Sequence, residues 1–245
     1  MENNIQSLDE LEKIAEKIRK KVIRRSYLNQ LSHVGSNLSC VRILTALYFS
    51  VMEEQDRFIM SKGHAALALY SVLSEKGILP PEILEGFGKK IETHVSDEIE
   101  GVEISTGSLG HGLPIALGMA LANEFSRIFV LLSDGELNEG SNWEAFCFAA
   151  KNPLRFQNLI AVIDNNGCDA LKEIEIEAEV LAIQALGWEV QIIQDRMEDI
   201  VSSLGRIEGA PHLVVVKTRK GEGVPALERD PVASHYLKLR EKDVN

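Results

Sequence analysis

The fold of this chain is decided by residues 128–167, which read IFVLLSDGELNEGSNWEAFCFAAKNPLRFQNLIAVIDNNG. The apolar runs Ile128–Leu132 and Leu159–Ile163 have the length and composition of buried strands. Asp134 follows the first run, Asn166 follows the second, and a helix fits between them. A right-handed helical crossover between parallel strands brings their carboxyl ends side by side. We therefore expect Asp134 and Asn166 to face the same point.

A carboxylate and a carboxamide at that edge of a sheet suit one kind of binding site. Both are hard oxygen ligands, which favour a magnesium ion held together with a phosphate of a substrate or cofactor. Asp-Gly and Asn-Gly pairs are also ordinary turn signals. The interpretation as a metal site therefore depends on further motifs in the chain.

The bulk composition is that of a globular protein. The chain has 245 residues, with 45% hydrophobic and 26% charged residues, which is enough for one large domain with a substantial core. The formal net charge of −11 argues against nucleic acid or an anionic membrane as the main partner. A phosphorylated substrate remains compatible, because a local basic or metal site can oppose the global charge.

Cysteine usage and the absence of long apolar runs predict a cytoplasmic protein. Cys40, Cys147 and Cys168 have no paired spacing, which fits a reducing compartment. Met1–Asn4 lacks the cationic and apolar pattern of a signal peptide, so we expect none. No apolar run approaches the roughly 18 residues of a membrane span.

Hydrophobic periodicity predicts an α/β fold with a doubly wound, mostly parallel sheet and helices on both faces. Helices are expected at Leu8–Leu28, Asn37–Met52, Ala65–Gly77, Pro80–Gly86, Leu113–Glu124, Asn142–Ala150, Ile174–Leu186 and Glu198–Ile207. Strands are expected at Ile128–Ser133, Leu159–Asp164, Trp188–Ile193 and His212–Thr218, with a polar loop at Lys89–Glu103. We interpret 1–245 as a single domain with a helical N-terminal extension, 1–55, and an irregular tail, 224–245.

Several further motifs stand in a fixed order along the chain. They are Ser32-His33-Val34-Gly35-Ser36, Ser61-Lys62-Gly63-His64-Ala65-Ala66 and Ser105-Thr106-Gly107-Ser108-Leu109-Gly110-His111-Gly112. Together with Asp134-Gly135 and Asn166-Gly167, this order and spacing resembles the N-terminal, cofactor-binding part of transketolase. The similarity runs from about residue 33 to residue 220, most of the chain.

The resemblance implies a thiamine-diphosphate-binding fold in which Mg²⁺ (or Ca²⁺) bridges the two phosphates of the cofactor. It implies three metal ligands: the Asp134 and Asn166 side chains and the backbone carbonyl of Cys168. Ser133 replaces the usual glycine before the aspartate, which leaves the ligand intact. The implied cofactor contacts are His64, Gly107, Ser108, Leu109, Asp134, Gly135, Glu136 and Asn166.

The resemblance also implies four catalytic histidines, since imidazole changes charge near neutral pH. His33 matches a histidine near the reacting carbon of the cofactor, and His64 one near the diphosphate and substrate. His94 matches a substrate-contacting histidine, although Thr93 and Val95 replace the flanking Gly and Pro. His235 matches a histidine of the C-terminal tail.

Three other residues have open or structural interpretations. Glu139 matches a glutamate at a subunit contact, and it equally fits a helix N-terminus favoured by the macrodipole. We call Gly107–Gly112 the glycine turn. In it, His111 replaces a common glutamine and is expected at a subunit interface. His212 leads a strand, and we expect it to be structural.

The implied activity is transfer of a two-carbon ketol unit from a ketose, or ketose phosphate, to an aldose or aldose phosphate. The glutamate that activates the cofactor belongs to a second domain in this family, and this chain ends before it. We therefore expect a partner subunit that carries the pyrimidine-binding domain, an α2β2 assembly, and no activity for this chain alone.

Two departures from the family put ordinary pentose phosphates in doubt. The loop after Cys168 runs through Asp169–Leu171 almost directly into Lys172-Glu173, and Gln194-Asp195-Arg196 replaces a Gly-His or Gly-Asn turn. Both segments are expected near the rim of the cofactor site. They favour a specialised role in sugar modification or secondary metabolism.

Three alternatives stay open at the level of sequence. A related 2-oxo acid decarboxylase or dehydrogenase α-subunit shares the metal motif, but the Ser-Lys-Gly-His motif and the glycine turn favour transketolase. A catalytically degenerate, partner-binding homologue would not need intact Asp134, Asn166, His33 and His64. A plain nucleotide-binding domain is the weakest, because no Gly-x-Gly-x-x-Gly follows the first expected strand.

Overall fold

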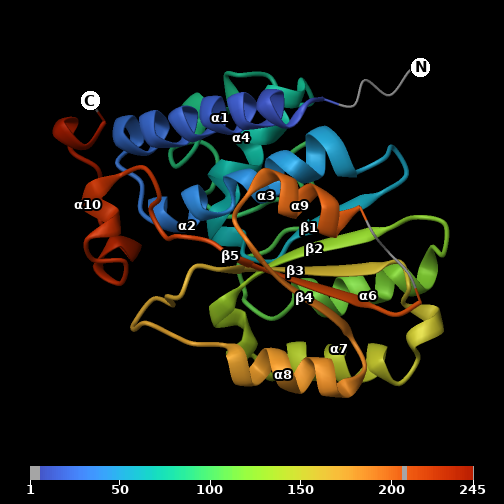
Figure 1. Ribbon diagram of the computed structural model, residues 1–245. Coiled ribbons are helices and arrows are strands. Elements are labelled where there is room, and N and C mark those ends of the chain that lie inside the picture. Colours follow the sequence, from blue (N-terminus) through green and yellow to red (C-terminus); the bar gives the residue numbers. More distant parts are fainter. Residues whose placement is uncertain (1–5, 206–208, 245) are drawn as a thin grey trace.

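The computed structural model describes residues 6–205 and 209–244. Within them, five parallel strands form one sheet in the order β1-β2-β3-β5-β4, and helices cover both faces (Figure 1). The strands are β1 (Arg57–Met60), β2 (Ile128–Ser133), β3 (Leu159–Asn165), β4 (Glu189–Gln194) and β5 (His212–Lys217). The α-helices are α1 (Leu8–Asn29), α2 (Val34–Ser39), α3 (Val41–Ala46), α4 (Ala66–Lys76), α5 (Ile83–Gly86), α6 (Gly112–Ala122), α7 (Gly140–Ala150), α8 (Glu177–Leu186), α9 (Met197–Leu204) and α10 (Pro225–Glu228).

The register of the central strands confirms the convergence expected from the crossover. Ser133 of β2 pairs with Asp164 of β3. Asp134 and Asn166 therefore leave the sheet at neighbouring points. The Gly167 N–H donates a hydrogen bond to Asp134 Oδ2 at 2.8 Å. The carboxyl edge of the sheet lies on the left in Figure 1, where the gold segment after β3 departs.

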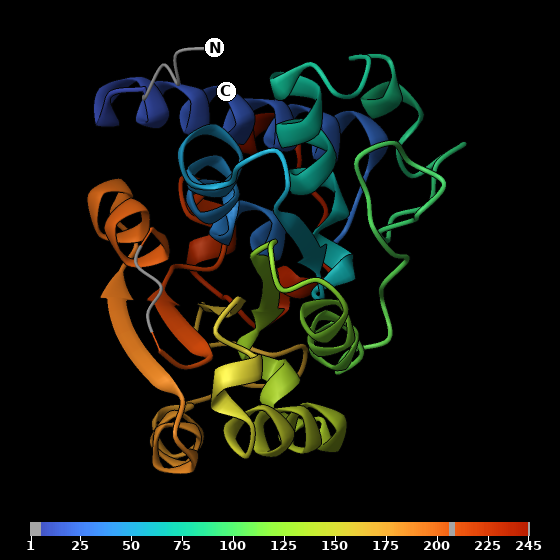
Figure 2. The same ribbon diagram turned by 90° about the vertical axis from the view of Figure 1, so that its right-hand side faces the viewer.

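The sheet is buried on both faces, which explains why its strands read as continuous apolar runs. In β2, Phe129 and Leu131 join the cluster beneath α1, α3, α4 and α9. Ile128, Val130 and Leu132 join the opposite cluster, above α6, α7 and α8. Figure 2 shows this layering, with α1 along one side and α7 and α8 along the other. The predicted doubly wound architecture is confirmed.

The N-terminal helices belong to the first of these clusters. Helix α1 begins with a capping box, in which Ser7 and Glu10 satisfy each other's backbone N–H groups. Leu11, Ile18 and Val22 are its buried face and pack in the same cluster as α3 and α4. In the described parts of the chain, no helix is both long enough and apolar enough to cross a membrane.

The structure differs from the expected elements in two places near the N-terminus. Strand β1 was not predicted, because its four residues are too few to show a period. The helix expected at Asn37–Met52 is broken at Cys40, whose φ of −98° and ψ of 5° leave the helical region. The last turn, Leu47–Val51, is a π-helix.

Near the C-terminus, α9 is shorter than the helix predicted at Glu198–Ile207, and residues 206–208 lie outside the described part. The predicted absence of a leader concerns Met1–Asn4, which also lies outside it. The tail 224–245, expected to be irregular, contains α10 and a 3-10 turn at Ala233–His235. That turn carries a predicted catalytic histidine toward the sheet.

A network of ions ties the C-terminal segment to the N-terminal helices. Arg42 Nη1 contacts Asp195 Oδ2 at 2.9 Å and Glu222 Oε1 at 3.0 Å. Arg19 Nη1 donates to the Glu222 carbonyl at 2.9 Å. Asp195, which is expected near the cofactor rim, directly follows β4 and contacts this network. Burial, assisted by the Glu222 carboxylate and opposed by Arg42, raises the pKa of Asp195 to about 7.

The raised pKa predicts how stability changes with pH. Between the ordinary pKa near 3.8 and about 7, the folded state holds a proton on Asp195 that the unfolded state has lost. The free energy of unfolding therefore falls as pH rises through this window. We expect Asp195→Asn to flatten that fall, measured by urea denaturation between pH 4.5 and 7.5. Asp9→Asn, in the exposed first turn of α1, is the control, and equal pH dependence in both variants would contradict the assignment.

Candidate functional site

A cavity of about 200 Å³ lies at the carboxyl edge of the sheet. Most of the predicted site residues line it, although they come from segments spread from residue 33 to residue 235. We call it the histidine cavity, and its lining is His33, Ser36, His64, His94, Gly107, Leu109, Ser133, Asp134, Gly135, Asn166, Cys168, Asp169, Ala170 and His235.

The four predicted catalytic histidines form one cluster. The ring of His33 lies 5.5 Å from that of His64, 6.2 Å from that of His94 and 4.7 Å from that of His235, between centroids. The Tyr236 ring packs against His235 at 4.7 Å. The C-terminal tail thus returns to the cavity and brings His235 to the other three histidines.

Backbone contacts hold this cluster in place. His33 occupies the left-handed region, with a φ of 60°, which is uncommon for a residue other than glycine. Its N–H donates to the His235 carbonyl at 3.0 Å, and its carbonyl accepts from Asn37 Nδ2 at 2.9 Å. Non-glycine residues in this region persist where surrounding contacts over-determine them, which is common at functional sites.

Burial lowers the pKa of three of these four imidazoles and favours their neutral form. It lowers the pKa of His33, and neighbouring His94 and Lys220 lower it further. Burial and Lys62 hold the pKa of His64 well below its ordinary value. Burial, with His33, lowers the pKa of His235 to about 4. At neutral pH the three rings can each accept one hydrogen bond and donate another.

The predicted metal ligands lie together at the base of the histidine cavity. Asp134 is almost fully buried, and its two oxygens accept backbone N–H groups of Gly135 and Gly167 at 2.9 and 2.8 Å. Burial, then the nearby Asp164 carboxylate, raises the pKa of Asp134 to about 6. Asn166 Oδ1 is buried without a hydrogen-bond partner.

These donors fit a hard divalent cation. An orphaned buried carbonyl oxygen carries an unmet desolvation cost, and Asn166 Oδ1 beside a carboxylate would recover it by binding a cation. In the described residues, no group of three or more His, Cys, Asp or Glu side chains is placed to hold a metal. The predicted set therefore depends on the Asn166 amide and the Cys168 carbonyl.

A fully buried ion pair supports the site from below. Lys62 Nζ and Asp164 Oδ2 are in contact, and both side chains are 0% exposed. Ser39 Oγ donates to Asp164 Oδ2 at 2.6 Å, and Thr218 Oγ1 donates to the other oxygen. Sequence reasoning gave neither charged residue a role, although Lys62 stands within the quoted Ser-Lys-Gly-His motif.

Removing one member of this pair should be costly. Asp164→Asn would leave the Lys62 ammonium buried without its counter-ion, a change that typically costs about 3–5 kcal/mol. We expect a loss of that size in the free energy of unfolding from chemical denaturation. Asp199→Asn breaks a surface pair with Arg196, whose side chain is 71% exposed, and should cost about 1 kcal/mol or less. Similar losses in the two variants would refute this role.

The glycine turn forms one wall through close backbone contact. A Cβ on Gly63 would lie 2.6 Å from the Thr106 carbonyl carbon and oxygen. A Cβ on Gly107, whose φ is 151°, would lie 3.0 Å from the His94 ring. Leu109 faces the histidine cavity, whereas Ser108 is exposed and does not line it.

Gly63→Ala should therefore displace this wall. The added methyl meets backbone rather than a flexible side chain, and overpacking of this kind costs about 1–3 kcal/mol. Gly118→Ala is the matched control, because a Cβ there meets open space on α6 and should be neutral or stabilising by about 0.5–1 kcal/mol. Thermal unfolding of both variants tests this, and equal midpoints would show that the wall yields freely.

Glu136 does not face the histidine cavity. It is fully buried, and its carboxylate accepts hydrogen bonds from Ser61 Oγ at 2.5 Å, the Gly110 N–H at 3.0 Å and the Ser133 N–H at 2.9 Å. It thus joins the glycine turn to the end of β2. Gly135 lines the histidine cavity, whereas the Glu136 carboxylate lies on the other side of this segment, away from the cavity.

The three remaining candidates lie away from the histidine cavity. Glu139 occupies the N-cap of α7 and packs against Gly110, so its role at a subunit contact stays a prediction. His111 is exposed at the N-cap of α6. His212 Nε2 contacts Glu189 Oε2 at 3.2 Å at the start of β5, as expected of a structural residue.

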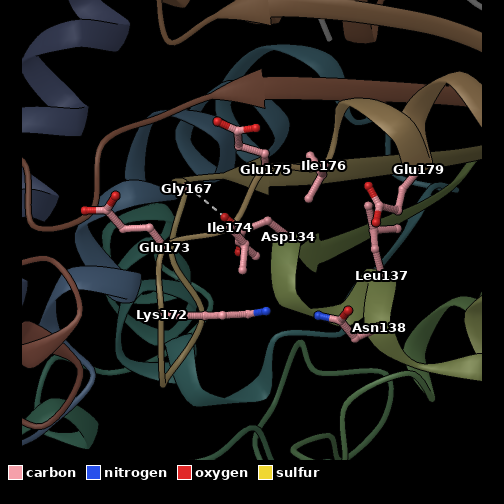
Figure 3. Close-up of a pocket in the computed structure, with 10 residues that line it drawn as sticks. All are labelled: Asp134, Leu137, Asn138, Gly167, Lys172, Glu173, Ile174, Glu175, Ile176 and Glu179. Atoms are coloured by element: carbon pink, nitrogen blue, oxygen red, sulfur yellow. Dashed lines mark hydrogen bonds between the residues drawn. The ribbon is translucent and has the colours of Figure 1, made fainter.

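A second pocket, of about 580 Å³, adjoins the first at Asp134. Figure 3 shows Asp134 among the residues that line it, with the Lys172 ammonium and the Asn138 amide pointing toward one another. Glu173 also lines this pocket. Asp134 therefore lies between the histidine cavity and a second pocket lined by several charged side chains.

Fold and site together define a class: a doubly wound α/β domain with a polar cavity at the carboxyl edge of parallel strands, where such domains bind ligands. Residues 13–245 match the family model described as transketolase, thiamine diphosphate binding domain. The chain belongs to the transketolase family and contains its thiamine-diphosphate-binding domain.

Relatives of similar length support the same conclusion. The chain is 37% identical to a subunit of the apulose-4-phosphate transketolase of Phocaeicola vulgatus, covering 90% of this chain and 86% of the relative. It is 35% identical to 6-deoxy-6-sulfo-D-fructose transketolase subunit SqwG of a Clostridium species, covering 90% of each.

Solved structures confirm the predicted fold. A transketolase variant from Pichia stipitis superposes with a TM-score of 0.83 at 26% identity, covering 98% of this chain and 40% of that one. The chain also spans 39% of the transketolase of Pongo abelii, to which it is 32% identical over 91% of its own length. It thus corresponds to about two fifths of these longer proteins.

Proposed function

We propose that this chain is the N-terminal subunit of a two-subunit transketolase that binds thiamine diphosphate and Mg²⁺. The observation that carries the proposal is the cavity at Asp134 and Asn166, where a buried amide oxygen without a partner lies beside a buried carboxylate. Asp134, Asn166 and the carbonyl of Cys168 would hold the metal. The backbone of Gly135, Gly107 and Leu109 would contact the cofactor.

Thiamine diphosphate, when bound, supplies the nucleophilic carbon and the electron sink for ketol transfer. The chain's own residues would bind and orient the cofactor and the substrate, and exchange protons with the substrate. Asp134 lines both pockets and would hold the metal and the diphosphate there, next to the imidazoles. His33, His64, His94 and His235 would bind substrate hydroxyl and carbonyl groups. Because burial lowers the pKa values of His33, His64 and His235, these rings are unprotonated at neutral pH and would act as hydrogen-bond partners and proton acceptors for the substrate.

The proposal includes a partner chain. The two relatives of similar length described above are named as transketolase subunits, and this chain covers two fifths of the longer transketolases. We propose that a separate subunit with the pyrimidine-binding domain completes an α2β2 enzyme in the cytoplasm. The chain alone would then be inactive.

The substrate proposed is a specialised ketose, with a phosphate or another anionic group. The relatives' names refer to apulose-4-phosphate and 6-deoxy-6-sulfo-D-fructose, which supports a role outside the ordinary pentose phosphates. The short connection from Cys168 to Glu173 also supports it. Normal rates of the assembled enzyme with xylulose 5-phosphate and ribose 5-phosphate would end this part of the proposal.

Calorimetry with the two-subunit complex tests the central claim. We expect tight, Mg²⁺-dependent binding of thiamine diphosphate. Asp134→Ala and Asn166→Ala each remove a proposed metal ligand and should weaken this affinity at least about 100-fold, where each tenfold change is about 1.4 kcal/mol of binding free energy. Asp9→Ala, an exposed aspartate on α1, should bind as the wild type does. A wild-type complex that binds no cofactor would leave the degenerate, partner-binding homologue as the better description.

A further inference from the structure

Three of the four histidines in the histidine cavity directly follow a hydroxyl residue in the sequence: Ser32-His33, Thr93-His94 and Ser234-His235. In the first two pairs the hydroxyl lies beside the imidazole. Ser32 Oγ is 3.0 Å from His33 Nδ1. Thr93 Oγ1 is 3.5 Å from His94 Nδ1. A polar partner at one ring nitrogen restricts the rotation of an imidazole and selects its tautomer, so these two histidines each have a local group that orients the ring.

His235 lacks this partner. Ser234 is fully buried, and its hydroxyl donates to the Pro231 carbonyl at 2.6 Å. Within residues 6–205 and 209–244, His235 Nδ1 is buried and has no hydrogen-bond partner. The His235 carbonyl accepts the His33 N–H at 3.0 Å, which fixes the main chain but not the direction of the ring. The orientation of this imidazole therefore has another source.

Aromatic packing supplies that orientation. The Tyr236 ring lies 4.7 Å from the His235 ring, between centroids, at an interplanar angle of 68°. The His33 ring lies 4.7 Å from the His235 ring at 78°. The Tyr236 and His33 rings are 6.1 Å apart, so the three rings form a closed triangle. These distances and steep angles are the favoured edge-to-face arrangement of aromatic side chains.

Tyr236 occupies this place without being part of the core. It is 66% exposed, and it does not line the histidine cavity, whereas both imidazoles that it contacts do. The 3-10 turn Ala233–His235 ends directly before it, and the Tyr236 N–H donates to the Ala233 carbonyl at 3.3 Å. An exposed ring that packs on two residues of the site points to a role in the site rather than in the stability of the core.

We propose that Tyr236 is a positioning residue for His235, whose ring it holds in the direction that a substrate meets in the histidine cavity. It does by packing what a neighbouring hydroxyl does at His33 and His94. The inference rests on the proposed function, in which His235 contacts the sugar. Without the Tyr236 ring, the His235 imidazole is free to turn away from His33.

A double-mutant cycle in the two-subunit complex tests this role, with xylulose 5-phosphate as donor and ribose 5-phosphate as acceptor. Slow turnover suffices, because only ratios between variants are compared. We expect Tyr236→Ala to lower kcat/KM about tenfold, and Tyr236→Phe, which keeps the ring, to stay within about threefold of the wild type. Added to His235→Ala, Tyr236→Ala should cause no further loss, because it acts only through that imidazole.

A matched control removes an aromatic ring elsewhere on the surface. Phe125 is 93% exposed and lies in the segment between α6 and β2. Phe125→Ala should equal the wild type. Should Tyr236→Ala fail to fold, Tyr236→Ser takes its place in the cycle.

NMR of the complex, with histidines of this chain labelled with ¹³C, follows the His235 ring itself. In the wild type, burial, with His33 and Lys220 and against Asp169, lowers the pKa of His235 to about 4. The His64 ring lies 6.3 Å away on the same side. We expect Tyr236→Ala to raise this pKa toward the ordinary 6.5, because a ring that turns outward regains water, and Tyr236→Phe to leave it unchanged.

The outcomes separate this inference from the proposed function. A wild-type complex that neither binds thiamine diphosphate nor transfers a ketol unit refutes the proposed function, while the NMR comparison still decides whether Tyr236 holds the His235 ring. In an active complex, a Tyr236→Ala variant with unchanged kcat/KM and unchanged pKa of His235 refutes only the role of Tyr236. So does an equal loss with and without His235, because Tyr236 would then act independently of that imidazole.

Discussion

Asp164 stands at the carboxyl end of β3, fully buried, and accepts hydrogen bonds from three other parts of the chain. Lys62 reaches it from the end of β1, Ser39 from α2 and Thr218 from the end of β5. Lys62 also donates to the Ser36 carbonyl at 3.0 Å. A buried carboxylate tolerates these surroundings only while every partner remains in place. The Asp164 carboxylate and its partners therefore hold together the segments at the edge of the sheet that carries the histidine cavity.

The same charge shapes the chemistry above it. Asp164 helps burial to raise the pKa of Asp134, and Lys62 opposes that shift. Lys62 also helps to keep His64 neutral. The site thus has the Lys62–Asp164 ion pair beneath it and the imidazoles of His33, His64 and His235, whose pKa values burial lowers, around its walls. A cation at Asp134 would relieve the cost of a second buried carboxylate close to the first.

The sequence predicts those features that depend on local pattern. Strands β2 and β3 are buried on both faces, so they appear as apolar runs, and the crossover places Asp134 beside Asn166. The histidine cluster could be predicted only from the resemblance to the transketolase family, because no local sequence pattern links His33 to His235. Strand β1 was too short to show a period.

Other features depend on contacts between distant segments. Glu136 looks like a continuation of the diphosphate loop, but the buried donors Ser61 and Gly110 draw its carboxylate inward. Asp195 follows a strand in a polar segment, and nothing in the local sequence predicts that it pairs with Arg42. Lys220 shows no signal in a charged stretch of sequence. In each case the partner lies tens of residues away, so only the fold reveals which charge is paired.

The two walls of the histidine cavity are constrained in different ways. On one side, Gly63, Thr106 and Gly107 are in such close backbone contact that no side chain fits between them. On the other, the segment after Asn166 forms a narrow hairpin, closed by a bridge between Cys168 and Glu173 and held from behind by Lys220. Tight packing fixes the first wall without regard to ligand. The second is held by polar contacts, including the hydrogen bond from Lys220 Nζ to the Asp169 carbonyl, so its position depends on hydrogen bonding rather than on packing.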